Sequence, residues 1–164
     1  AGDGADVLSG MVGNDTLDGG AGDDTLTGGD GFDSLIGGAG DNDTVTYAGS
    51  TQYVALNLMA AGINGDAVGD TYSGIEHAIG TNFADTITGT LGANTLTGLV
   101  GNDSLDGGDG DDVLIGGVGG DTLVGGAGTD SVDYAGSAAI TLNLHTGTHT
   151  GGDAAGDSFA GIER

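Results

Sequence analysis

The chain has 164 residues, enough for one ordinary domain, and carries 25 acidic side chains against one basic side chain, Arg164. Because nucleic acids and anionic membranes are recognised by Lys and Arg, a formal net charge of −24 argues against both as partners. The 39 glycines and the small share of large apolar residues leave little for a hydrophobic core, so the acidic groups need cations. With three histidines and no cysteine, the hard oxygen-binding ions Ca²⁺ and Mg²⁺ are favoured over zinc or copper.

The first segment of the chain, residues 1–45, has a strict period of nine residues. Acidic side chains recur at Asp6, Asp15, Asp24 and Asp33, and Asn42 continues the series. An apolar side chain follows two residues after each acid, and a glycine stands two residues before it. A short period of this kind is the mark of a solenoid made of stacked repeats.

Three further segments follow, and together they make the chain nearly two copies of one unit of 87 or 88 residues. Residues 46–75 form a spacer without the nine-residue period, residues 76–133 form a second repeat block, and residues 134–164 form a second spacer that resembles the first. Glu76 lies nine residues before Asp85, so the period resumes there and we expect one continuous solenoid. Both ends interrupt the repeat, which predicts an excerpt of a longer protein.

The two blocks resemble the RTX, or hemolysin-type, family of calcium-binding repeats, whose pattern is G-G-x-G-x-D-x-U-x with U large and apolar. The segment 19–27, Gly-Gly-Ala-Gly-Asp-Asp-Thr-Leu-Thr, matches it fully, as does the segment 107–115. The resemblance implies an all-β fold, a right-handed parallel β-roll (β-solenoid) with calcium ions in the turns. It also implies a protein secreted by a Gram-negative bacterium through a type I channel.

The residue types agree with that fold. Positions one to six of the pattern predict a turn, because glycine tolerates positive φ angles and close backbone approach. Positions seven to nine predict a three-residue strand whose middle side chain points inward. Two repeats would complete one coil, so side chains 18 residues apart would stack and acids such as Asp6 and Asp24 would share an ion.

The predicted metal ligands are the side chains at position six and the backbone carbonyl groups that the resemblance adds. The side chains are Asp6, Asp15, Asp24, Asp33, Asn42, Asp43, Glu76, Asp85, Asn94, Asp103, Asp112, Asp121 and Asp130. The carbonyl groups of the first block are those of Gly2, Gly4, Gly13, Gly19, Gly20, Ala21, Gly22, Gly28, Asp30, Gly37 and Ala39. Those of the second block are Gly98, Val100, Gly101, Gly107, Gly108, Asp109, Gly110, Gly116, Val118, Gly125 and Ala127.

Departures from the pattern limit the expected number of ions. Asn94 replaces an aspartate and so removes one negative charge from each of the two sites to which it would contribute. Asn42 has the same effect on the site that it would share with Asp24, although an inserted residue brings Asp43 within reach of that site. About five to eight Ca²⁺ ions are therefore expected, on the rule that each needs six to eight oxygen ligands. Acids outside position six are expected to be solvated; they include Asp18, Asp106 and Asp133, and the spacer acids Asp66, Asp70, Asp153 and Asp157, which could alternatively hold an extra ion.

The expected function is that of a structural calcium-binding module of an extracellular or cell-surface protein, which folds on binding calcium after export. The main alternative is a self-assembling segment of a surface layer, filament or adhesin stalk, because a stacked roll has open ends. A third possibility is the C-terminal secretion module of an exported enzyme. No catalytic motif is present, so we expect no enzymatic activity in this chain; a zinc site at His145, His149 and Asp153 is a weak alternative.

Overall fold

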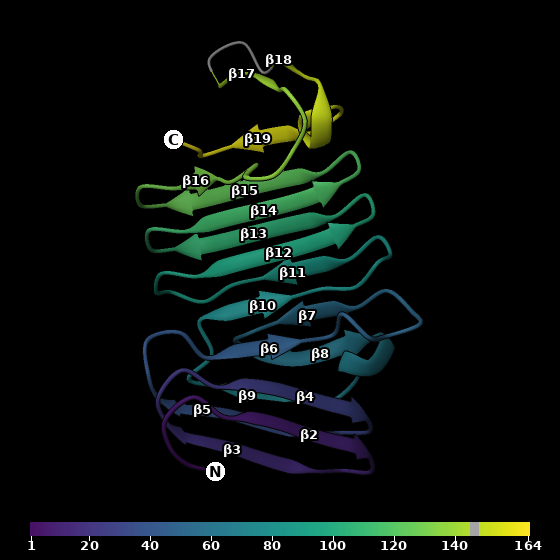
Figure 1. The fold of residues 1–164 in the computed structure, drawn as a ribbon, viewed down its shortest axis with the longest axis vertical. Coiled ribbons are helices and arrows are strands. Elements are labelled where there is room, and N and C mark those ends of the chain that lie inside the picture. The colour runs from purple at the N-terminus through teal and green to yellow at the C-terminus, as the bar shows by residue number, and fades with distance from the viewer. Residues whose placement is uncertain (145–147) are drawn as a thin grey trace.

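A computed structural model describes residues 1–144 and 148–164 of the chain. They form one elongated parallel β-solenoid whose coils stack from the N-terminal to the C-terminal end (Figure 1). This confirms the predicted all-β roll and the single solenoid. Within the described residues no helix is long and apolar enough to cross a membrane.

One face of the solenoid is an uninterrupted sheet of seven strands, which we call the continuous sheet. Its strands follow the chain order and pair in parallel, with Leu8 beside Leu26 and Leu96 beside Leu114, 18 residues apart as predicted. They are β2 (Val7–Val12), β4 (Thr25–Asp30), β6 (Thr44–Thr46), β10 (His77–Ile79), β12 (Thr95–Val100), β14 (Val113–Val118) and β16 (Ser131–Val132).

The opposite face, which we call the split face, consists of two separate sheets. The first has four strands: β1 (Gly2–Asp3), β3 (Thr16–Ala21), β5 (Ser34–Ala39) and β9 (Thr71–Ser73). The second has six, in the spatial order β8 (Ala60–Asn64), β7 (Ala55–Asn57), β11 (Thr86–Thr88), β13 (Ser104–Asp109), β15 (Thr122–Ala127) and β19 (Ser158–Ala160).

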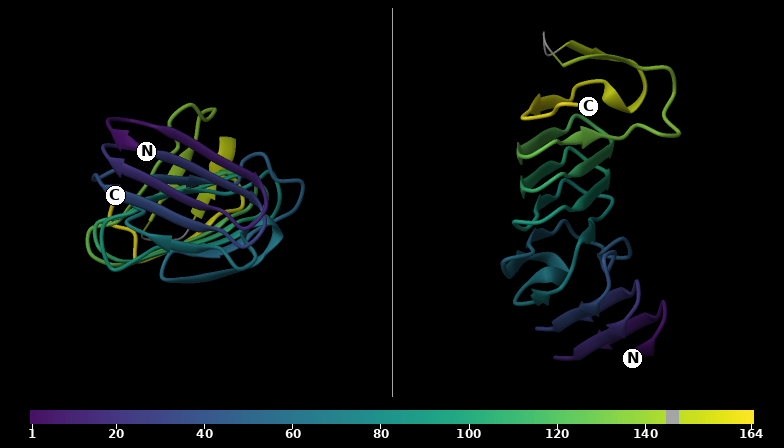
Figure 2. Two further views of the ribbon diagram at one scale, coloured as in Figure 1. Left: turned by 90° about the horizontal axis from the view of Figure 1, so that it is seen from below. Right: turned by 90° about the vertical axis from the view of Figure 1, so that its left-hand side faces the viewer.

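Each spacer adds irregular structure before the split-face strand in which it ends, β9 or β19. In the first spacer, β7 and β8 form an antiparallel hairpin and a 3₁₀ turn η1 (Gly65–Ala67) leads into β9. In the second spacer, β17 (Thr141–Asn143) pairs with β18 (Thr148–Thr150) and η2 (Gly152–Ala154) leads into β19. Figure 2 shows the first block tilted relative to the second at the level of the first spacer.

The block strands are longer than predicted. Strands such as β4 and β14 contain six residues, because parallel pairing continues through the two glycines and the next residue of the following repeat. The turn therefore shrinks to the few residues that end in the acid. Glycine permits this continuation where the backbone has a positive φ, as at Gly29 (φ 100°) and Gly117 (φ 95°).

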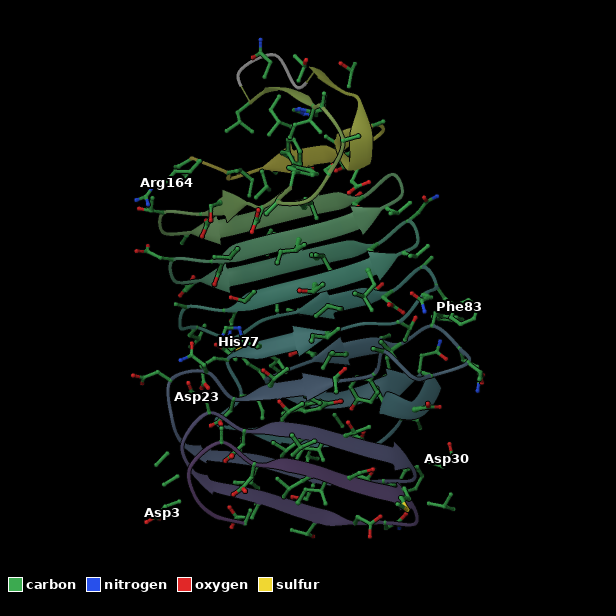
Figure 3. The ribbon with its side chains drawn as sticks, viewed as in Figure 1. Asp3, Asp23, Asp30, His77, Phe83 and Arg164 are labelled. Atoms are coloured by element: carbon green, nitrogen blue, oxygen red, sulfur yellow. The ribbon has the colours of Figure 1, made fainter. Side chains whose placement is uncertain are left out.

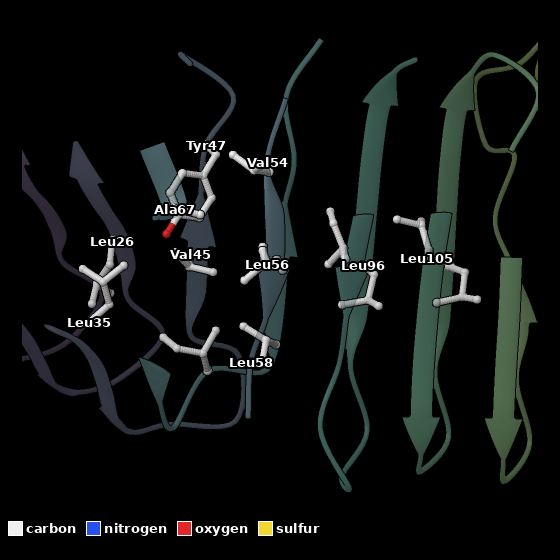
Figure 4. Close-up of a cluster of buried hydrophobic side chains, with 14 of the residues drawn as sticks. Leu26, Leu35, Val45, Tyr47, Val54, Leu56, Leu58, Ala67, Leu96 and Leu105 are labelled. Atoms are coloured by element: carbon white, nitrogen blue, oxygen red, sulfur yellow. The ribbon is translucent and has the colours of Figure 1, made fainter. Parts of the chain in front are cut away.

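The core is a narrow stack of aliphatic side chains between the two faces (Figure 4). Its fully buried members include the predicted inward residues Leu26, Leu35, Ile87, Leu96, Leu105, Leu114 and Leu123. Val54, Leu56 and Leu58 of the first spacer also face inward, with at most 5% of each side chain exposed. Each fully buried side chain of this size stabilises the fold by roughly 1.5–3 kcal/mol.

Candidate calcium sites in the turns

The side chains at position six, all of them acidic except Asn94, form two columns, one along each edge of the solenoid. The first column, in the turns that lead into the continuous sheet, contains Asp6, Asp24, Asp43, Glu76, Asn94, Asp112, Asp130 and Glu163. The second column, in the turns that lead into the split face, contains Asp15, Asp33, Asp70, Asp85, Asp103, Asp121 and Asp157.

In most of these carboxylates, one oxygen accepts a hydrogen bond from the backbone of the neighbouring coil. The amide of Asp15 donates to Asp33 Oδ1 at 2.8 Å, and the amide of Asp103 donates to Asp121 Oδ1 at 2.9 Å. In the first column Asp112 N donates to Asp130 Oδ1, also at 2.9 Å. The repeat therefore places most of these acids above the backbone of the acid one coil below; at Asp85 the amide below is that of Val54. These bonds fix the stacking.

The second oxygen is buried and has no hydrogen-bond partner among the described residues in eight of these carboxylates. These are Oδ2 of Asp15, Asp24, Asp33, Asp43, Asp103, Asp112, Asp121 and Asp130, four in each block. A buried carboxylate oxygen without a partner is strongly unfavourable, since several kcal/mol of hydration are lost. Eight such atoms in register point to a set of cation sites.

Backbone carbonyl groups converge on the same points. A β-carbon placed on Gly10 would lie 2.8 Å from Asp15 Oδ2 and 2.6 Å from the carbonyl oxygen of Gly28 in the coil above. The same convergence of the acid with a carbonyl oxygen from the next coil is found at Asp24 with Gly37, Asp43 with Gly74, Asp103 with Gly116, Asp112 with Gly125, and Asp130 with Gly161. Glycine at position one thus leaves open a cradle that any side chain would fill.

Burial shapes the electrostatics of these carboxylates. It raises the pKa of Asp103, Asp112 and Asp121 to about 6 in each case, although the backbone hydrogen bond that each accepts lowers it. Neighbouring acids add to the rise, as Asp85 does for Asp103. A bound divalent cation would reverse this effect and hold the groups ionised.

The donor set fits calcium. Carboxylate oxygens and backbone carbonyls are the ligands that Ca²⁺ prefers, and its variable coordination tolerates their irregular arrangement. No cluster of three or more His, Cys, Asp or Glu side chains occurs in the described part of the chain, so each ion would depend on carbonyl groups as well as on acids. Arg164 is the one Lys or Arg of the sequence, so internal ion pairs cannot neutralise the buried carboxylates of the two columns.

At the inserted residue of the first block, Asp43 and not Asn42 occupies the place in the column. Asp24 N donates to Asp43 Oδ1 at 2.8 Å, which places Asp43 in the first column. Asn42 instead lies on the surface, where its Nδ2 contacts Asp23 Oδ2 at 3.3 Å and its Oδ1 contacts His77 Nε2 at 3.2 Å. The extra residue bulges outward, so the prediction of Asn42 as a ligand in the column is wrong.

Two predicted ligands at the start of the second block have their hydrogen bonds satisfied by threonines. Thr81 N donates to Asp85 Oδ2 at 2.5 Å, and Thr81 Oγ1 donates to Asp85 Oδ1 at 2.9 Å. Asn94 Oδ1 likewise accepts from Thr90 N at 2.6 Å and from Thr90 Oγ1 at 3.0 Å. These threonines stand at position two, where most block turns have glycine, and their turns lack an unpartnered acid.

The structure also adds column members that the period did not indicate. Asp70 and Asp157 are buried, and their Oδ1 atoms accept the amides of Asp33 at 2.8 Å and Asp121 at 2.9 Å. The prediction that these two acids are solvated in loops is therefore wrong. By contrast, Asp18, Asp106 and Asp133 are exposed as expected.

The zinc site considered for the histidines is not formed by the residues that the structure describes. His145 lies outside the described residues, and His149 is buried with its ring centroid 4.0 Å from that of Phe159. Figure 3 shows Asp3 and Asp23 projecting from one turn edge, and Asp30 and Phe83 projecting from the other.

The fold and the two columns define a class of protein, a parallel β-solenoid with cation cradles between its coils. A family model described as the RTX calcium-binding nonapeptide repeat matches the chain in four copies, at residues 1–35, 21–50, 79–114 and 106–136. The chain belongs to this RTX calcium-binding repeat family. A search of curated proteins finds no match to the chain.

Proposed function

We propose that this chain is a structural module that folds when calcium fills its turn cradles in a calcium-rich compartment outside the cell. The eight buried, unpartnered carboxylate oxygens are the observation that carries the proposal. Without cations they oppose folding of a chain that already carries a formal charge of −24. Eight Ca²⁺ ions would bring that charge to −8, because each contributes two positive charges.

The calcium concentration would then set the folded population. Metal binding supplies folding free energy when the unfolded chain holds no preformed site. Extracellular calcium modules bind with a Kd of roughly 10⁻⁴–10⁻³ M, far above the free calcium of the cytosol. The module would stay unfolded inside the cell and fold after export, and its role would be structural rather than catalytic.

The test is a calcium titration of the purified chain from a chelated start, followed by far-UV circular dichroism. We expect a cooperative transition from coil to strand at sub-millimolar to millimolar calcium, about eight bound ions at saturation, and no transition with magnesium. A chain that is already strand-rich in chelator, or that binds no calcium, would overturn the proposal.

The alternative role, end-to-end assembly into a stalk or filament, has one observation in its favour. Leu56 of β7 and Leu58, which directly follows β7, are buried at 2% and 5% exposure, whereas Leu142 and Leu144, their equivalents in the second spacer, are 36% and 40% exposed. In the first spacer these leucines are covered because β11 packs beside β7. Sedimentation velocity of the calcium-loaded samples distinguishes the two roles, since assembly would give species larger than a monomer.

A further inference from the structure

The first spacer is an insertion within one coil. Tyr47 N donates to Ile79 O at 2.9 Å, just as Gly80 N donates to Thr97 O at 2.8 Å one coil later. Tyr47 therefore stands at position one of its coil, where block coils have glycine. Asp70 stands at position six of the same coil, because its Oδ1 accepts the amide of Asp33.

The residue at position one determines whether the inner oxygen of the coil's aspartate faces an open cradle or a side chain. In a block coil such as 28–33, a β-carbon on Gly28 would collide with Asp33 Oδ2, so glycine keeps the cradle open. In the spacer coil a tyrosine occupies this place, with 3% of its side chain exposed. Its hydroxyl donates to Asp70 Oδ2 at 2.6 Å.

The hydroxyl network around Asp70 is complete. The Tyr47 hydroxyl group lies 2.7 Å from that of Tyr72. Because the proton of Tyr47 is given to the carboxylate, Tyr72 must be the donor to Tyr47. Asp70 Oδ2 is consequently not among the eight unpartnered oxygens, although Asp70 is fully buried.

The second spacer repeats the arrangement independently. Tyr134 follows β16 as Tyr47 follows β6, and its hydroxyl donates to Asp157 Oδ2. Asp157 Oδ1 accepts the amide of Asp121. Phe159 occupies the place of Tyr72 and has no hydroxyl, so the pairing of tyrosine with aspartate is the part that both spacers share.

We propose that Tyr47 and Tyr134 take the place of a calcium ion in their coils, so that each repeat block ends its second column with a metal-free coil. This inference rests on the proposed function, in which calcium fills the block coils. The phenol supplies the one hydrogen bond that the inner carboxylate oxygen needs, and its ring fills the cradle. Each block then keeps four ions, and no ion lies beside Asp70 Oδ2 or Asp157 Oδ2.

The test compares Tyr47→Phe and Tyr134→Phe with two controls in the full chain. Tyr53→Phe changes a tyrosine of the same spacer that is 49% exposed, and Tyr72→Phe copies the natural Phe159. Bound calcium is counted by equilibrium dialysis, and the calcium midpoint of folding is measured by circular dichroism. We expect unchanged ion counts in all variants and a midpoint raised about twofold in Tyr47→Phe and Tyr134→Phe alone, because a buried acceptor loses its donor.

Three outcomes would overturn the inference. Midpoints equal to that of Tyr53→Phe would show that the hydroxyl groups do not matter, and a count lowered by one would make the hydroxyl an ion ligand. If Tyr47→Phe does not fold, the double variant Tyr47→Phe with Asp70→Asn is measured: recovery of folding supports the pairing, and no recovery contradicts it. A wild-type chain that binds no calcium would instead refute the proposed function.

Discussion

At the scale of single residues, the position-one glycine is as important to the candidate sites as the aspartate. A carboxylate supplies charge, but the cradle exists only because no side chain projects into it. A β-carbon on Gly98 would lie 2.6 Å from the carbonyl oxygen of Gly116 and closer still to Asp103 Oδ2. The repeat therefore needs this glycine for space, since it is not among the residues with positive φ.

Gly98→Ala should consequently remove one ion and weaken calcium-induced folding. Gly92→Ala is the matched control, because its β-carbon would meet only Thr90 Oγ1, at 3.9 Å. We expect dialysis to count one ion fewer for Gly98→Ala, with a higher calcium midpoint, and wild-type values for Gly92→Ala. Equal ion counts in the two variants would show that the cradle is not an ion site.

The sites within the blocks could be predicted from the sequence because their ligands recur at fixed intervals. Asp33 and Asp70 are neighbours in the second column yet lie 37 residues apart, since the spacer is inserted within a coil. No period links them, so burial of Asp70 could not be foreseen. The hydroxyl of Thr81 was missed for another reason: threonine at a turn is common, and only the structure shows it donating to Asp85.

At the scale of elements, every block strand contributes one inward side chain to a core only one residue wide. The six-residue strands β13 and β15 pair over Leu105 and Leu123, and both leucines are fully buried. The outward side chains beside them, such as Asp106, contact solvent. The inward pattern was predictable from the period, whereas the added strand length was not, because glycine pairs carry little strand propensity.

Leu105→Ala should lower the free energy of unfolding by about 2–5 kcal/mol in saturating calcium, because it opens a cavity in this narrow core. Leu91→Ala provides the comparison, since that side chain is 70% exposed in a turn and should change stability by less than about 0.5 kcal/mol. Urea denaturation followed by circular dichroism measures both. Similar losses in the two variants would contradict the assignment of Leu105 to the core.

At the scale of the whole molecule, proton and calcium binding should have opposite effects on the acidic columns. Without metal, the pKa of Asp103, Asp112 and Asp121 is about 6 in the fold, against an ordinary value of 3.8. The folded chain then binds more protons than the unfolded chain between these two values. The metal-free fold therefore loses stability as the pH rises from about 4 to 6.

In chelator, the chain should consequently be more compact at pH 5 than at pH 7.5, and in calcium the order should reverse. A pH of 5 also stays above the isoelectric point of about 4.1, where the chain would carry little charge and tend to precipitate. Small-angle X-ray scattering measures the radius of gyration, which is roughly 43 Å for an unfolded chain of this length. An unfolded radius at both pH values in chelator would contradict the expectation.

The hairpin of the first spacer has a consequence for the shape of longer arrays. Strands β7 and β8 lie on the split face between β9 and β11, whereas on the continuous sheet β6 and β10 are direct neighbours. Two additional strands lengthen one side of the solenoid by about 10 Å at the usual spacing of strands in a sheet. Such a wedge bends the axis, so tandem copies of the 87- or 88-residue unit would trace an arc whose curvature depends on how often a spacer interrupts the repeats.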